Sequence, residues 1–327
     1  MKKFVISLIM CAFMVVGFLG LGTEAASAAA IKLKLAHIQA AGSTLDKQSQ
    51  KFKEICETQS GGKLQINIYP AAQLGKMPEI LEGVSMGTID LTFETISWLS
   101  QFNKDLNFFG APFLVQDIKQ ITEHPALWKI LDQIRVKNNI RVLALGGLRP
   151  QMHLWTRTKP VRTLEELQGV KLRVPPIKAY VDTWNGLGAI AVGIPFSELY
   201  MALAQNVVDG IVHNASQVKD QKFDELLKYA TLLYFKPVIN SIMMNERKYQ
   251  SLTPDLQEIM VEATKKSGDY YDQLILTEEK KAWDAMEKEG LQVFEVDRDP
   301  WFNKARAVLR KSEENGSWSK GLLDTLN

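Results

Sequence analysis

The sequence contains few cysteines and little excess of either charge. Two cysteines in 327 residues exclude a small fold held together by disulfides. Lys and Arg number 39, Asp and Glu 37, and like charges do not cluster in runs, so no nucleic-acid partner is expected. With 46% hydrophobic and 23% charged residues, the composition also excludes a disordered or collagen-like chain. The length favours two domains over one.

The sequence also lacks the common motifs of nucleotide, metal and nucleophilic chemistry. It has no G-x-x-x-x-G-K-[ST], no G-x-G-x-x-G after a strand, no H-E-x-x-H and no C-x-x-C. One G-x-S-x-G string surrounds Ser85, but a nucleophile elbow needs a strand before it and a helix after it, and here that order is reversed. We therefore expect neither an enzyme nor a cofactor.

Histidine is scarce as well, with only His37, His124, His153 and His213. No two of them have the spacing of metal ligands within one element. Folding could still gather three, because His37 follows the first predicted strand, His213 ends a later one and His153 lies at the start of the second half. A metal-binding or hydrolytic periplasmic protein that uses these three histidines is the alternative function, although we expect no metal.

The first thirty residues have the layout of a cleaved export signal. Lys2 and Lys3 precede an apolar run from Phe4 to about Leu21, and small residues end at a cleavage site at Ala28. A retained membrane or lipid anchor is the alternative. Residues 1–28 are thus predicted to be a signal peptide and the mature chain a periplasmic protein not inserted in the membrane. Of the cysteines only Cys56 then remains, in a helical pattern typical of a buried small side chain.

The mature sequence opens with alternating strand and helix patterns. Residues 31–36 alternate strictly between apolar and polar, which predicts a strand with one buried face. A helix is predicted from about 43 to 61, a strand at 64–68, a short helix at 78–87 and a strand at 89–93. This order is typical of an α/β domain with a largely parallel sheet.

A second α/β unit follows. Strands are predicted at 141–145, 170–174 and 207–212, and helices at 177–187 and 197–206.

The sequence then predicts one very long helix. Residues 254–289 form a helix-compatible run without a further proline, about 50 Å long if unbroken, which would cross from one domain to the other. Two helices that break at Gly268 are the alternative. A strand at 291–296 and a helix at 299–314 complete the pattern.

Arg173 is the strongest candidate for a binding residue. It lies near the carboxyl end of the 170–174 strand, just before Pro175 and Pro176, and open α/β sheets bind their ligands at such ends. A guanidinium there can hold a carboxylate through two parallel charge-assisted hydrogen bonds, which a lysine cannot reproduce. A surface ion pair is the alternative role for an arginine in this position.

The whole mature chain resembles the solute-binding proteins of tripartite ATP-independent periplasmic (TRAP) transporters, in their dicarboxylate-receptor-like branch. The resemblance rests on the order and spacing of short motifs, namely Tyr69-Pro70-Ala-Ala-Gln73-Leu74-Gly75, Gly87-Thr-Ile-Asp90, Pro112-Phe113, Leu167-Gln-Gly169-Val-Lys171-Leu-Arg173-Val-Pro175, Phe196-Ser-Glu198-Leu-Tyr200 and Val208-Asp209-Gly210.

This resemblance implies a two-lobed periplasmic binding protein fold of the α/β class, with discontinuous lobes and a long helix spanning both. Lobe I would comprise residues 29–152 and about 239–278, and lobe II residues 153–238 and about 279–327. The chain would capture a small carboxylate by closing its lobes and deliver it to the membrane subunits of the transporter. A receptor for another transporter, or a sensor domain, is the alternative within the binding class.

The resemblance also implies the site residues. Arg173 takes the place of the family's carboxylate-binding arginine, and Phe196 lines the site. His37 and Thr95, which follow strands of lobe I, would close over the ligand.

The chain departs from the family pattern at two places. Where members often have a second arginine, about twenty residues before the first, this sequence has His153. After Val-Asp-Gly it continues Ile211-Val212-His213-Asn214 instead of Gln-Glu-Asn-Pro, so His213 and Asn214 join the candidate ligand-binding residues. Trp155, and also Trp98, could add aromatic walls. A pocket with one fixed charge fewer and more apolar surface predicts an aromatic or heteroaromatic monocarboxylate in preference to a dicarboxylate or a sialic acid.

Overall fold

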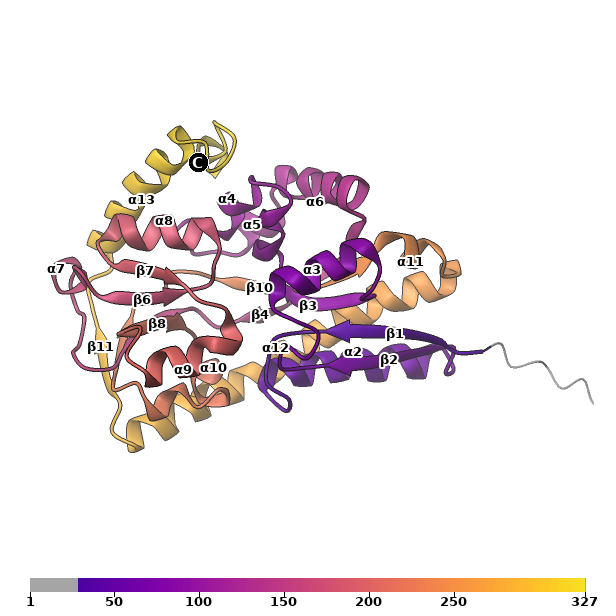
Figure 1. Cartoon of the computed structure of the whole chain (residues 1–327), viewed down its shortest axis with the longest axis horizontal. Helices are drawn as coiled ribbons and strands as arrows, with labels where there is room; N and C mark the ends of the chain where they lie inside the picture. The colour runs from indigo at the N-terminus through magenta and orange to yellow at the C-terminus, as the bar shows by residue number, and fades with distance from the viewer. Residues whose placement is uncertain (1–28, 327) are drawn as a thin grey trace, which may run out of the picture.

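Two β-sheets organise the protein, which we describe from a computed structural model over residues 29–326. The predicted signal peptide lies outside the described residues. The first sheet has the strand order β2-β1-β3-β10-β4. In it, β1 pairs in parallel with β2 and β3, whereas β10 pairs antiparallel with both β3 and β4 (Figure 1). Its strands are β1 (Ile31–Ala36), β2 (Leu64–Tyr69), β3 (Leu91–Thr95), β4 (Ile140–Arg149) and β10 (Val238–Asn245).

The second sheet has the strand order β11-β9-β5-β8-β6-β7. In it, β6 pairs in parallel with β7 and β8, and β5 pairs antiparallel with β8 and β9. Its strands are β5 (His153–Thr156), β6 (Lys171–Val174), β7 (Ile190–Gly193), β8 (Gly210–His213), β9 (Tyr229–Leu232) and β11 (Gln292–Glu295).

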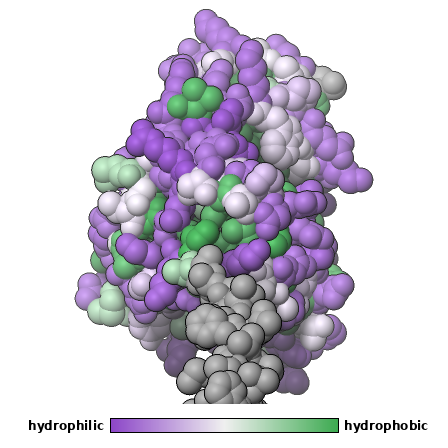
Figure 2. All heavy atoms as spheres, turned by 90° about the vertical axis from the view of Figure 1, so that its right-hand side faces the viewer, coloured by the Kyte–Doolittle hydropathy of each residue, from purple (hydrophilic) through white to green (hydrophobic). Residues whose placement is uncertain are grey.

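Helices flank both sheets (Figure 1). The first lobe and the connections that follow it carry α2 (Thr44–Gln59), α3 (Met77–Met86), η2 (Ile96–Gln101), α4 (Leu106–Gly110), α5 (Lys119–Thr122), α6 (Pro125–Asn138) and α11 (Glu246–Gln250). The second carries α7 (Leu164–Leu167), α8 (Lys178–Leu187), η3 (Phe196–Glu198), α9 (Leu199–Ala204), α10 (Ala215–Asp220), η4 (Phe223–Glu225), α13 (Asp299–Glu314) and η5 (Leu323–Leu326). Mostly hydrophilic side chains cover the end of the first lobe that Figure 2 presents.

The long helix is continuous. α12 (Pro254–Lys288) runs for 35 residues and packs on α2 and β4 in the first lobe and on α10 in the second. Gly268 does not break it, so the alternative of two helices is wrong. A Cβ at Gly268 would lie 2.6 Å from the carbonyl carbon of Gly146, so glycine permits close packing of the helix on β4. The two-sheet architecture and the bracing helix agree with the predicted fold class, while the exact lobe boundaries remain a prediction.

The strand predicted at 141–145 is longer than expected. β4 continues to Arg149 through a β-bulge, since Ser241 of β10 faces Leu145 whereas Ile239 faces Leu148. Gly147 allows this bulge because it adopts a φ of 89°, and a Cβ there would lie 2.7 Å from the Gln48 side chain. The extension carries Arg149 to the boundary between the lobes.

Candidate functional site

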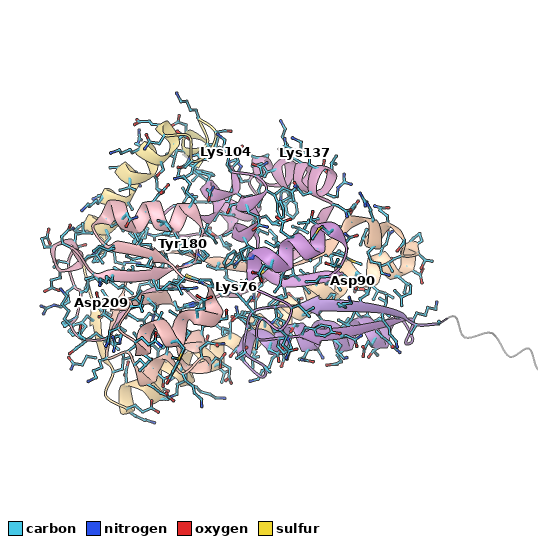
Figure 3. The ribbon with its side chains drawn as sticks, viewed as in Figure 1. Lys76, Asp90, Lys104, Lys137, Tyr180 and Asp209 are labelled. Carbon is cyan, nitrogen blue, oxygen red and sulfur yellow. The ribbon has the colours of Figure 1, made fainter. Side chains whose placement is uncertain are left out.

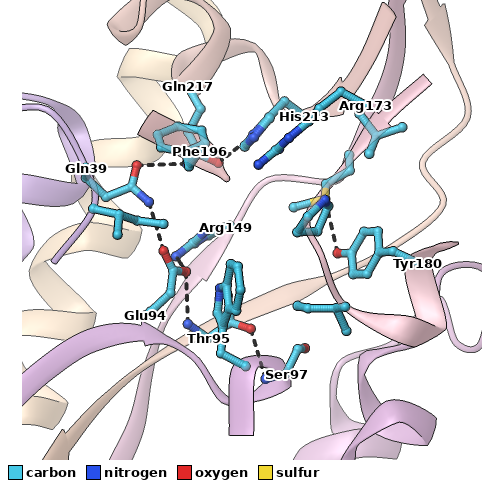
Figure 4. A pocket seen from close by; sticks show the side chains of 16 residues that line it. Gln39, Glu94, Thr95, Ser97, Arg149, Arg173, Tyr180, Phe196, His213 and Gln217 are labelled. Carbon is cyan, nitrogen blue, oxygen red and sulfur yellow. Dashed lines mark hydrogen bonds and ion pairs between the residues drawn. The ribbon is translucent and has the colours of Figure 1, made fainter. Parts of the chain in front are cut away.

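A cavity lies between the two lobes, with an empty volume of about 500 Å³ that includes space open to solvent. Figure 4 shows the sixteen side chains that line it, which come from both lobes: Ile38, Gln39, Glu94, Thr95, Ser97, Trp98, Arg149, Met152, Arg173, Pro175, Ile177, Tyr180, Phe196, Val212, His213 and Gln217. The cavity therefore brings together Arg173, Phe196, His213, Thr95 and Trp98 from the predicted set.

Arg173 is a buried cation in this cavity. β6 lies between β7 and β8, which places Arg173 beside Val192 and Ile211 with only 2% of its surface exposed. Its Nε donates a hydrogen bond to the carbonyl oxygen of Ile194 at 2.9 Å. Within residues 29–326 no carboxylate pairs with it, so the surface ion pair considered above is not formed. Burial lowers the pKa of Arg173 to about 9, which still leaves the group charged at neutral pH.

A second arginine, Arg149, also lines the cavity, and sequence reasoning missed it. Its Nη2 donates to Oε1 of Glu94, and its Nε donates to Oδ1 of Asn240 at 2.5 Å. The other oxygen of Glu94 accepts from Nε2 of Gln39 at 2.8 Å, and its Oε1 also accepts from the backbone N–H of Thr95 at 2.9 Å. Figure 4 shows the bonds of Glu94 with Arg149, Gln39 and Thr95 on one side of the cavity. Arg149 is thus neutralised by a buried carboxylate, whereas Arg173 is not.

His213 faces the cavity from the end of β8. Its Nδ1 lies 3.0 Å from Oε1 of Gln217, and the amide of Gln217 donates across the lobes to Oε1 of Gln39 at 3.3 Å. Burial, and then the charges of Arg173 and Arg149, lower the pKa of His213 to about 3. His213 is therefore a neutral, hydrogen-bonding ring at neutral pH.

Four predicted site residues do not line the cavity. His37 is fully buried, with Nε2 3.0 Å from Oδ1 of Asp46 at the start of α2. Asn214 precedes α10, and its Nδ2 donates to Ser216 and, at 3.2 Å, to Glu279 of α12. Both side chains make hydrogen bonds elsewhere, and neither lines the cavity.

The other two belong to an aromatic cluster with Tyr234 and Trp283. Trp155 stacks on Trp283 with ring centres 4.9 Å apart, and its Nε1 donates to the carbonyl oxygen of His213 at 2.8 Å. His153 packs edge-on against Tyr234 and Trp283. β5 pairs His153 directly with His213, but of these two histidines only His213 lines the cavity. These two residues support the second lobe, where Trp283 of α12 meets β5.

The three histidines of the alternative function do not form a metal site in this arrangement. Among the described residues, no three His, Cys, Asp or Glu side chains lie close enough together to hold a metal ion. His37, His153 and His213 each have separate packing partners instead.

Over the same part of the chain, no helix has the length and apolar character needed to span a membrane.

The buried histidines make stability sensitive to acid. Burial lowers the pKa of His153 to about 4, so below about pH 6.5 the unfolded state binds more protons than the folded state. Stability should therefore fall between about pH 6.5 and pH 4, with His153 contributing about 2 to 3 kcal/mol of this loss at about pH 4.5. Urea unfolding of the parent and of His153→Phe should show a flatter pH dependence in the variant, and equal slopes would contradict this assignment.

Comparison with known proteins shows the family to which this chain belongs. The profile of the bacterial extracellular solute-binding protein family 7, DctP, matches residues 35–315. The chain belongs to this family of TRAP transporter solute-binding proteins. The sialic acid-binding periplasmic protein SiaP of Vibrio cholerae is 25% identical over 92% of this chain and 94% of its own length. The C4-dicarboxylate-binding protein DctP of Rhodobacter capsulatus is 26% identical over 81% of this chain and 80% of its own length.

The fold of this TRAP solute-binding protein also matches solved structures of the family. A TRAP periplasmic solute-binding protein from Ochrobacterium anthropi with bound L-fuconate has a TM-score of 0.84 and 27% identity, over 91% of this chain and 100% of that one. Another, from Bordetella bronchispeptica with density attributed to pantoate, has a TM-score of 0.82 and 23% identity, over 90% and 98%. The predicted family and fold class are thus confirmed.

Proposed function

We propose that this protein is the exported, periplasmic receptor of a TRAP transporter, and that it captures a small organic acid in the interlobe cavity and delivers it to the membrane subunits. The observation that carries the proposal is the buried guanidinium of Arg173, which has no carboxylate partner within the described residues. Burying a charge without a partner is unfavourable, and a ligand carboxylate would supply that partner. Relatives named for sialic acid and L-fuconate also bind carboxylates.

The mechanism we propose is a shift between open and closed lobes. The described arrangement has several contacts across the boundary, including Lys76 Nζ to Glu198 Oε1 at 2.5 Å and the Thr44 backbone N–H to Asp220 Oδ2 at 2.7 Å. Figure 3 shows Lys76 where the lobes meet. A ligand that touches both lobes favours the closed arrangement by its difference in affinity for the two states.

The lining supports an apolar body on the ligand. Six of the cavity side chains are large and apolar: Ile38, Trp98, Met152, Ile177, Phe196 and Val212. The ring of Phe196 lies 5.8 Å from the Arg173 guanidinium carbon, so a ligand anchored by its carboxylate at Arg173 would extend over that ring. We therefore keep an aromatic or heteroaromatic monocarboxylate as the proposed ligand, with sugar acids as the competing class.

A thermal-melt screen of residues 29–327 tests this proposal, after partial unfolding to remove any ligand carried through purification. A ligand at a hundred times its dissociation constant stabilises the folded state by about 2.7 kcal/mol, which raises the melting midpoint by a few degrees. We expect aromatic monocarboxylates to raise it more than succinate, sialic acid or L-fuconate. A shift produced by zinc, with none from any carboxylate, would instead support the histidine alternative.

A further inference from the structure

Two guanidinium groups line one small cavity, but only one of them has a protein counter-ion. Arg149 and Glu94 are 4% and 2% exposed and form an ion pair, while Arg173 has none within the described residues. The remaining titratable groups in the lining are His213 and Tyr180. His213 is uncharged at neutral pH, and burial raises the pKa of Tyr180 above its usual value, so this group is uncharged as well. The cavity thus has a single uncompensated positive charge.

One further cation lies nearby but outside the lining. Lys236 donates to the carbonyl oxygen of Gly110, and its Nζ lies 4.8 Å from the centre of the Tyr180 ring. Lys236 is not among the residues that line the cavity, so we expect no direct contact between its ammonium and a ligand there.

We infer that Glu94 is a specificity-determining residue, which neutralises Arg149 and so restricts the cavity to ligands with one carboxylate. The inference rests on the proposed function, since it assumes that Arg173 anchors a carboxylate. A monoanion would leave the closed cavity electrically balanced. A dianion would bring a second charge into a buried site where the only other cation is already paired, which is unfavourable.

The surroundings of Glu94 hold its carboxylate against Arg149. Its backbone is fixed in β3 opposite Ser241 of β10, whose hydroxyl donates to the Glu94 carbonyl oxygen at 2.7 Å. Its side chain accepts from the Thr95 backbone and from Gln39, and Asn240 orients Arg149 from the other side. Because both oxygens of Glu94 are used, a ligand cannot displace it without breaking several hydrogen bonds.

Glu94→Gln tests the inference, because glutamine keeps the size of the side chain and one oxygen that can accept from Arg149 and Thr95, but gives up the acceptor for Gln39 and releases the charge of Arg149. The probes are two matched pairs, benzoate with the benzenedicarboxylates and butyrate with succinate, titrated by calorimetry. In the parent we expect each monocarboxylate to bind more tightly than its dicarboxylate. In Glu94→Gln we expect the ratio of dicarboxylate to monocarboxylate affinity to rise at least about tenfold.

The double variant Glu94→Gln/Arg149→Gln is the matched control. It removes both charges of the pair and leaves Arg173 alone, so its affinity ratio should return to that of the parent. A Glu94→Gln ratio equal to the parent's, or a double variant that keeps the raised ratio, would overturn the inference.

A measurement on the parent keeps the inference open to refutation even if Glu94→Gln does not fold. Any succinate that binds the parent should do so as a monoanion, taking up close to one proton, whereas butyrate should take up none. Calorimetry in two buffers with different heats of ionisation measures this uptake. Succinate binding tighter than butyrate without proton uptake would overturn the inference and leave the receptor function standing. If neither pair nor any other carboxylate binds the parent, the proposed function itself fails.

Discussion

Arg173→Ala should weaken ligand binding by about 30-fold to more than 1,000-fold, because removing one partner of a buried charge pair typically costs roughly 2 to 5 kcal/mol. The group is 2% exposed and has no other carboxylate within the described residues to balance it. Arg173→Lys should also bind weakly, since lysine has neither the bond to the Ile194 carbonyl nor two parallel donors for a carboxylate. Isothermal titration calorimetry with the acid identified in the melt screen measures both losses.

Lys171→Ala is the matched control for this prediction. Lys171 lies two residues earlier on the same strand, but its side chain is exposed and does not line the cavity. Its removal should leave affinity unchanged. If Arg173→Ala binds within threefold of the parent, Arg173 is not the anchor.

Lys236→Met should change how stability depends on pH. Lys236 lies in the segment between β9 and β10 and is 4% exposed, and burial lowers the pKa of its ammonium to about 7. Between about pH 7 and pH 10.5 the unfolded state therefore binds more protons than the folded state, so the lysine's contribution to stability rises with pH. From about pH 7 to pH 9 the parent should gain about 2 kcal/mol relative to the methionine variant.

Urea unfolding at these two pH values measures the difference. Lys228→Met serves as the control, because Lys228 is exposed and its removal should leave the pH dependence of the parent unchanged. The same slope in the parent and in Lys236→Met would show that the buried lysine does not carry this linkage.

The larger elements could be predicted because their signals are local. The α13 helix occupies residues 299–314 as expected, since its amphipathic pattern and Pro300 at the start define it without knowledge of its neighbours. The long run from Pro254 likewise needs only the absence of helix breakers. Gly268 could be interpreted either way from sequence, and its close approach to Gly146 shows why a glycine occurs inside that helix.

The site was harder to predict because it depends on contacts distant in sequence. Arg149 reaches the cavity through a bulge in β4, which becomes recognisable only once β10, from residues 238–245, pairs against it. The glycine pair at 146–147 was the one available signal, as glycine within a strand often marks a bulge. His153 was placed in the site by its spacing from Arg173, but its ring packs against Tyr234 and Trp283 and does not line the cavity.

The structure changes which residue is expected to set the charge of the ligand. The sequence suggested that the pocket had lost a fixed charge at His153, and the structure has a second arginine after all, at Arg149, paired with Glu94. A ligand with one negative charge is expected in both cases. From the sequence this expectation came from His153, whereas from the structure it comes from Glu94.

The most direct test of the account is a crystal structure of residues 29–327 with the acid that gives the largest thermal shift. The account predicts a carboxylate between the lobes, with its two oxygens within hydrogen-bond distance of the Arg173 guanidinium, its body against Phe196, and the Arg149–Glu94 pair intact. A ligand carboxylate bound by Arg149 or by the histidines, with Arg173 left without an anionic partner, would contradict it.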